Sequence, residues 1–312
     1  MEVWGGNQPV DSGVVMAGLD AWVYSKPYAG ALAGGDVHYV SSCATGRITR
    51  LLVADVAGHG TAVSLTALAL RALMRRFVNF IDQTRFVNSL NDEFVALSQD
   101  GVFATAVVTT FFAPTGELSL CNAGHPAPLL YRAKAGRWSL LEAAPHVSTT
   151  SDSTPNYPLG IVDLADYEQF SLRLRTGDLV LCYSDSLIEA KNAAGDWLGP
   201  TGLLEIVQSL DPSASDTLIP RLLDAIRARA VENLTDDDVT VLLFRPNGMA
   251  PRAPFLQRIL APFRVLGGIL GSLKPGGAPA PWPEFSLLNL FGIAPRRRTS
   301  ISDDRESAET PI

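Results

Sequence analysis

The chain has 312 residues, 47% of them hydrophobic, so it can bury a large core without disulfides or a structural metal. Its 25 basic and 32 acidic side chains give a net charge of −7, which argues against nucleic acid as a partner. The three cysteines form no CxxC pair, and we see neither a secretory signal nor a run of roughly 18 apolar residues. We therefore expect a cytoplasmic globular protein.

Strand-like runs dominate residues 1–245 and are predicted at 19–24, 37–43, 47–56, 103–112, 117–122, 128–132, 167–174, 179–183 and 239–244. Turn signals such as Pro114-Thr115-Gly116 indicate antiparallel hairpins between several of them. Helical periodicity predicts two consecutive pairs, 61–77 with 85–97 and 203–209 with 213–231. Together these elements predict an α+β sandwich, with two sheets and the helices grouped outside them.

The composition changes near residue 246. Residues 246–312 carry 8 basic and 5 acidic side chains, whereas 1–245 carry 17 and 27. We predict an N-terminal lead-in with the first strand (1–30), a folded domain (31–245) and a Pro- and Gly-rich tail (246–312). The tail's apolar segments 255–273 and 285–293 lie beside arginines. This pattern fits docking on a membrane surface or a partner, which would make the protein peripheral at the membrane, and it equally fits a linker folded back on the domain.

Acidic residues recur where predicted strands meet tight turns: Gly34-Gly35-Asp36, Asp55-Val56-Ala57-Gly58-His59-Gly60, Ser184-Asp185-Ser186 and Asp236-Asp237-Asp238. An Asp beside a Gly is commonly only a turn residue. Four such places together favour a metal site, because oxygen ligands suit Mg²⁺ or Mn²⁺ and carboxylates at one sheet end would otherwise repel one another.

The ordered motifs resemble the metal-dependent protein serine/threonine phosphatases of the PP2C type, and within them the SpoIIE/RsbU-like branch. The motifs are AGGDVHYV (33–40), LLVADVAGHG (51–60), LCNAGHPAPLLY (120–131), PLGI (158–161), TGDLVLCYSDSLIEAKNAAGDWLG (176–199) and DDDVTVLLFR (236–245). The resemblance implies an αββα sandwich of two mainly antiparallel sheets flanked by helix pairs. It also implies a site for two or more Mn²⁺ or Mg²⁺ ions between the sheets.

By resemblance, Asp36 would bind one metal, and Asp55 would bridge both with help from the Val56 carbonyl. Asp185 and Asp237 would complete the ligand set, and Asp236 would be a solvated neighbour. A water activated by the two cations would attack the phosphorus of phosphoserine or phosphothreonine on a protein, for which a STAS-type anti-anti-sigma factor is a candidate. Asp55 is thus both a ligand and a catalytic residue. A catalytically inert phosphatase-like binding module is the alternative.

Two histidines lie in these motifs. His59 is a candidate catalytic general acid for the leaving alkoxide, although Gly58-His59-Gly60 equally fits a strand-to-helix turn with a structural imidazole. His125 lies in a motif next to the expected site, but a turn-stabilising role is at least as consistent with it, and we assign it no catalytic role.

One position departs from the resemblance, because Ser186 stands where these phosphatases usually have Gly. If the backbone there requires positive φ, Ser186 would strain the loop by about 1 kcal/mol and could displace Asp185.

A further prediction concerns the helix that follows Asp55. Its residues Arg71, Arg75 and Arg76 are either a basic face for an acidic, activating partner or an ordinary solvated face.

Overall fold

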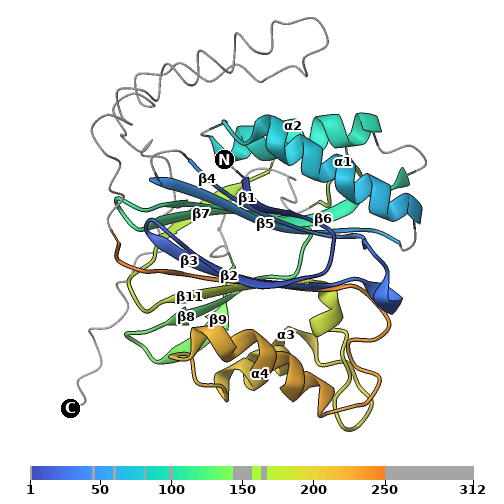
Figure 1. Cartoon of the computed structure of the whole chain (residues 1–312), viewed down its shortest axis with the longest axis vertical. Helices are drawn as coiled ribbons and strands as arrows, with labels where there is room; N and C mark the ends of the chain where they lie inside the picture. The colour runs from blue at the N-terminus through green and yellow to red at the C-terminus, as the bar shows by residue number, and fades with distance from the viewer. Residues whose placement is uncertain are drawn as a thin grey trace, which may run out of the picture.

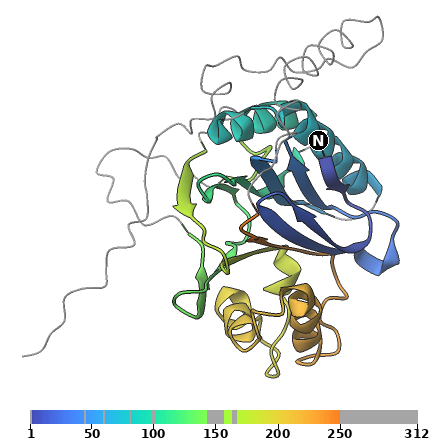
Figure 2. The same cartoon turned by 60° about the vertical axis from the view of Figure 1, so that its left-hand side comes forward.

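The computed structural model describes residues 2–43, 46–58, 61–80, 82–97, 101–142, 157–162 and 167–249. Two six-stranded sheets stack face to face, and a helix pair covers the outer face of each (Figures 1 and 2). The first sheet has the order β1 (Glu2–Gly6), β4 (Asp36–Ser42), β5 (Ile48–Val56), β6 (Ala104–Phe112), β7 (Glu117–Ala123) and β10 (Gln169–Arg173). The second has the order β2 (Val10–Met16), β3 (Leu19–Lys26), β12 (Val239–Pro246), β11 (Leu179–Tyr183), β8 (Leu129–Arg132) and β9 (Arg137–Leu140).

Neighbouring strands in both sheets pair antiparallel. Helices α1 (Thr61–Phe77) and α2 (Gln83–Leu97) cover the first sheet, and α3 (Gly199–Gln208) and α4 (Ser215–Arg227) cover the second (Figure 1). The predicted α+β fold, an αββα sandwich, is confirmed. Within the described residues no helix is long and apolar enough to cross a membrane.

Three strands were not predicted from the sequence. β1 and β2 are edge strands of the two sheets, and β9 is the opposite edge of the second sheet. The side chains of β2 are mostly exposed, and β1 ends in two glycines. Edge strands of this kind lack the alternation of buried apolar residues that identifies a strand in a sequence.

The alternation of side chains along each strand separates three apolar layers. In β5, Leu52 and Ala54 pack with α1 and α2, whereas Leu51 and Val53 pack with residues of the second sheet. Asp55 has the same parity as Leu51 and Val53, so it lies on the side that faces the other sheet. The fold therefore directs a carboxylate into the space between the sheets at the end of β5.

A buried arginine holds the connection between α1 and α2 on the first sheet. The Arg50 guanidinium donates to the Val78 and Phe80 carbonyls at 3.2 and 2.7 Å and to the Thr110 hydroxyl at 3.0 Å. It also stacks over the Phe86 ring at 4.2 Å, and burial lowers its pKa to about 10. The helix pair that follows Asp55 is thus anchored to the sheet at its far end.

Of the arginines on the predicted basic face, Arg76 forms an ion pair with Glu93 of α2 at 3.0 Å. At least part of this face therefore interacts within the helix pair. A role in binding an acidic partner stays a prediction.

Candidate active site

Asp36 and Asp55 stand directly opposite each other on β4 and β5. Like charges at opposed positions of a sheet destabilise it unless something compensates them. Asp36 is only 3% exposed, and its pKa is raised well above the usual value by burial and then by Asp55 and Asp238. Its Oδ2 atom is buried without a hydrogen-bond partner among the described residues. A buried carboxylate oxygen without a donor is the position at which a cation would be favourable.

The Asp55 carboxylate, on the first sheet, is repelled by carboxylates that flank strands of the second sheet. Burial is the largest of the effects that raise its pKa to about 7, and the charges of Asp185, Asp237, Asp238 and Glu189 contribute the rest in that order of importance. Asp185 starts a short 3-10 turn (Asp185–Leu187) directly after β11, and exposed Asp237 lies just before β12. The four carboxylates predicted from the sequence are therefore brought into one cluster at the same end of the sandwich.

Asp238 was missed by the sequence analysis. Its buried carboxylate accepts hydrogen bonds from the backbone N–H groups of Gly35, of Asp36 at 3.1 Å and of Tyr28 at 2.6 Å. A Cβ on Gly34 would lie 2.3 Å from Asp238 Oδ2, so no side chain fits there. The Gly34-Gly35 pair was the available signal, because adjacent glycines before a strand often mark the close approach of another group.

The Val56 carbonyl lies beside the same loop. A Cβ on Gly35 would stand 3.0 Å from this oxygen and 2.9 Å from a methyl group of Val63, the third residue of α1. The Val56 N–H also faces the Gly35 carbonyl, at 3.4 Å. Val56 therefore lies against the loop that carries Asp36, next to both predicted aspartates. His59 lies outside the described residues.

The donor set fits a hard divalent cation, because it consists of carboxylate and carbonyl oxygens. Within the described ranges, no three His, Cys, Asp or Glu side chains already stand in a geometry that would hold a metal ion. Two observations therefore support a metal site: the carboxylates repel one another, and the Asp36 Oδ2 atom has no hydrogen-bond donor among the described residues. The described side chains do not yet form a coordination geometry.

Comparison with known proteins identifies the family of the chain. The model of the SpoIIE family (Stage II sporulation protein E) matches residues 45–247. The chain belongs to the SpoIIE family. It is 24% identical over 232 residues to the phosphoserine phosphatase RsbU of Bacillus subtilis, an alignment that covers 73% of this chain. The chain spans only 63% of the length of RsbU.

Solved structures show the same fold. The RsbU and RsbW domains of a Mycobacterium tuberculosis protein match with a TM-score of 0.62 and 24% identity, over 85% of this chain and 71% of that one. The PP2C phosphatase domain of Bacillus subtilis SpoIIE, with a fragment of its regulatory domain, matches with a TM-score of 0.62 and 16% identity, over 74% and 64% of the two chains. RsbX in complex with magnesium matches with a TM-score of 0.55 and 13% identity, over 76% and 100%.

In this SpoIIE-family chain, His125 has a structural position. Its Nε2 lies 3.0 Å from the Tyr183 carbonyl, which can only accept, so Nε2 carries the proton and Nδ1 accepts from the Thr105 hydroxyl at 2.8 Å. Burial lowers the His125 pKa to about 4. The neutral imidazole thereby links β6 of one sheet to the end of β11 in the other, two residues before Asp185.

The expected strain at Ser186 is not found. In the described residues only Ala29 and Leu234 have positive φ among non-glycine residues, so Ser186 does not need the conformation that favours Gly. Ser186 lies in the 3-10 turn, and its hydroxyl is 3.1 Å from that of Ser184. The condition for a strained loop is therefore not met, because Ser186 lies in a 3-10 turn and does not have positive φ.

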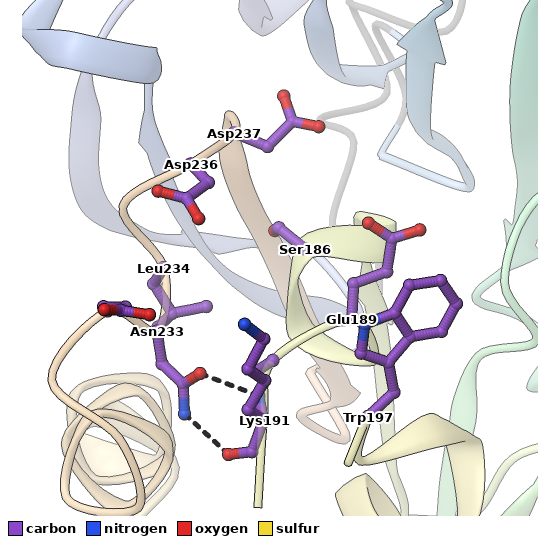
Figure 3. Close-up of a pocket in the computed structure, with 10 residues that line it drawn as sticks. Ser186, Glu189, Lys191, Trp197, Asn233, Leu234, Asp236 and Asp237 are labelled. Carbon is purple, nitrogen blue, oxygen red and sulfur yellow. Dashed lines mark hydrogen bonds between the residues drawn. The ribbon is translucent and has the colours of Figure 1, made fainter. Parts of the chain in front are cut away.

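A surface pocket of about 180 Å³ adjoins Asp237 (Figure 3). One wall carries Glu189, Lys191 and Trp197, and the other carries Asn233, Leu234, Asp236 and Asp237 (Figure 3). The Asn233 side chain joins the walls, because it accepts from the Lys191 N–H at 2.7 Å and donates to the Lys191 carbonyl at 2.9 Å. Glu232 and Asp236 also line the pocket, so its carboxylates outnumber its single cation, and the Trp197 indole is 68% exposed.

Proposed function

We propose that this SpoIIE-family chain is a metal-dependent phosphatase that hydrolyses phosphoserine or phosphothreonine on a protein. The observation that carries the proposal is the placement of Asp36 opposite Asp55 on β4 and β5, with the Asp36 Oδ2 atom buried and without a hydrogen-bond partner among the described residues. Burial and neighbouring carboxylates accordingly raise the pKa values of both, at a site made only of oxygen donors. Buried carboxylates that repel one another lower the stability of a fold unless a cation binds to them, so a protein that binds no cation has no stability reason to contain them. The name of RsbU, a phosphoserine phosphatase, supports the same reaction.

In this proposal Asp36, Asp55, Asp185, Asp237 and the Val56 carbonyl hold two or more Mn²⁺ or Mg²⁺ ions. The ions, when bound, supply the Lewis acidity that lowers the pKa of a water nucleophile. Magnesium in the RsbX structure supports a cation of this class.

Neighbouring groups of the chain set the pKa and the backbone position of the proposed ligand Asp36. The neighbouring side chains of Thr240 and Ser184 lower the pKa of Asp36, which opposes the effect of burial. Asp238 fixes the backbone on which Asp36 stands, through its bond to the Asp36 N–H. His59 stays a proposed general acid that would protonate the leaving serine or threonine oxygen.

The pocket beside Asp237 supports a protein substrate rather than a small metabolite. It is smaller than the roughly 300–1,000 Å³ of ordinary small-molecule sites and suits one side chain next to the phosphorylated residue. Its excess of carboxylates and the exposed Trp197 indole favour a basic side chain. The SpoIIE/RsbU resemblance makes a STAS-type anti-anti-sigma factor in a partner-switching pathway, in the cytoplasm, the proposed substrate class.

The test is phosphate release from phosphoserine peptides with Mn²⁺, with Mg²⁺ and with EDTA, for the wild type and for Asp55→Ala. We expect release with the metals and none with EDTA or with Asp55→Ala. Turnover in EDTA would exclude the metal mechanism. If no ester or peptide is hydrolysed at millimolar Mn²⁺, the chain is the inert binding module instead.

A further inference from the structure

Asn7 lies in the short connection between β1 and β2, where the chain passes from the first sheet to the second. This connection precedes the segment matched by the SpoIIE family model, which begins at residue 45. The residue is 1% exposed, although it is an amide in a turn between two edge strands. A polar side chain buried this deeply normally has a specific hydrogen-bonding role.

The Asn7 side chain joins the two elements that carry the candidate site. Its Nδ2 donates to the Gly34 carbonyl at 2.7 Å and faces the Ser64 carbonyl and hydroxyl at 3.1 and 3.2 Å. The Asn7 backbone carbonyl also accepts from the Gly34 N–H at 2.8 Å. Both polar groups of Gly34, two residues before Asp36, are therefore bound by one residue.

The second anchor, Ser64, lies in the first turn of α1, the helix that follows the Asp55 motif. Asn7 thus connects the loop before Asp36 with the helix after Asp55. On the other side, Gly34 is closed in by the Asp238 carboxylate, which leaves no room for a Cβ. The Gly34 backbone is held between Asn7 and Asp238, so its position is determined from two directions.

The two polar atoms of the Asn7 amide differ in their hydrogen bonding. Asn7 Oδ1 is buried without a hydrogen-bond partner in the part of the chain that the structure describes. Burying an unpaired acceptor is unfavourable, and an apolar side chain would avoid that cost. An amide occupies this position although only its N–H groups have partners there, so the link from Gly34 to Ser64 is the interaction that it provides.

We infer that Asn7 is a positioning residue for the proposed metal centre, which sets the Asp36 backbone relative to α1 and so to Asp55. The inference rests on the proposed function. Residues that orient metal ligands typically change metal affinity by about 10–100-fold when they are replaced. Asn7→Ala removes the link, and Asn7→Asp places a carboxylate against two carbonyl oxygens, so the second variant has the larger effect.

The experiment measures Mn²⁺ affinity directly, from the loss of the free-Mn²⁺ electron paramagnetic resonance signal on titration of the protein. Asn91→Ala is the matched control. Asn91 is fully buried, and its amide also tethers backbone, donating to the Val162 carbonyl and accepting from the Gly160 N–H, both at 3.0 Å. The loop that it tethers contains none of the proposed ligands.

We expect Mn²⁺ binding to weaken by about tenfold or more in Asn7→Ala and to stay within about twofold of the wild type in Asn91→Ala, although both variants melt at lower temperature. Equal Mn²⁺ affinity in Asn7→Ala and the wild type would overturn the inference and leave the proposed function intact. A wild type that binds no Mn²⁺ would overturn both. If Asn7→Ala does not fold, Ser64→Ala removes one acceptor of the same link, and unchanged affinity in that variant also overturns the inference.

Discussion

Replacing Asp55 with asparagine removes a negative charge from the carboxylate cluster while nearly preserving the size of the side chain. Burial and the nearby carboxylates raise the Asp55 pKa from 3.8 to about 7. At about 1.4 kcal/mol per tenfold change in proton affinity, this difference corresponds to about 4 kcal/mol against the ionised form in the folded state. Asp55 is partly exposed, so water and salt reduce the effect, and we expect the variant to gain about 1–3 kcal/mol at about pH 8 without metal.

The sign follows from proton linkage. Because the folded pKa lies above the unfolded value, the folded state binds more protons between about pH 4 and about pH 7. The contribution of Asp55 to the free energy of unfolding is therefore present below about pH 4 and is lost as the pH rises to about 7. Asp55→Asn should flatten this dependence only in part, since the pKa of Asp36 is raised as well.

The assay is urea unfolding followed by circular dichroism in EDTA, at about pH 5 and about pH 8, with phosphatase activity measured in parallel with Mn²⁺. The variant should be inactive and yet more stable than the wild type at the higher pH. Mn²⁺ should stabilise the wild type more than the variant. Glu205→Gln, at an exposed position of α3, is the control and should show no such pH dependence. A variant that is less stable than the wild type by the same amount at both pH values would refute the reasoning.

Three further outcomes are expected from the same site. Ser186→Gly should leave kcat unchanged and lower the free energy of unfolding by about 1 kcal/mol, because it adds backbone freedom and removes a hydroxyl contact; a clear rise in kcat would show that the serine strains the turn after all. Asp238→Asn should cost about 2–3 kcal/mol in urea unfolding and weaken Mn²⁺ binding, because three backbone N–H groups lose a charged acceptor. The lowered pKa of His125 means that its contribution to stability is present above about pH 6.5 and is lost as the pH falls to about 4, by up to about 3 kcal/mol. The unfolding free energy of His125→Gln, compared with the wild type across this range, should lack that component, and identical pH profiles would contradict the neutral, buried imidazole.

Much of the architecture was predictable because its central strands have a recognisable sequence pattern. β5, β6, β11 and β12 are buried on both faces and consist largely of β-branched and other apolar residues, so their sequences indicate strands without knowledge of their neighbours. The residues of α1 that pack on the sheet recur at helical spacing: Val63, Ala67, Leu70, Met74 and Phe77. The edge strands β1 and β2 were missed because half-exposed, glycine-containing edges have no such pattern.

The sequence alone determined which chemistry the site offers, because carboxylates beside tight turns are local features that motif spacing can reveal. Only the tertiary structure decided how these groups are arranged. It set Asp36 opposite Asp55, buried the Asp238 carboxylate against the glycine loop, and gave Ser186 a backbone conformation without strain. It also brought Asn7 to Gly34 and Ser64, across 27 and 57 positions of the chain. Such contacts depend on the register of paired strands and on the packing of sheet against helix, which are properties of the folded chain and not of any local segment.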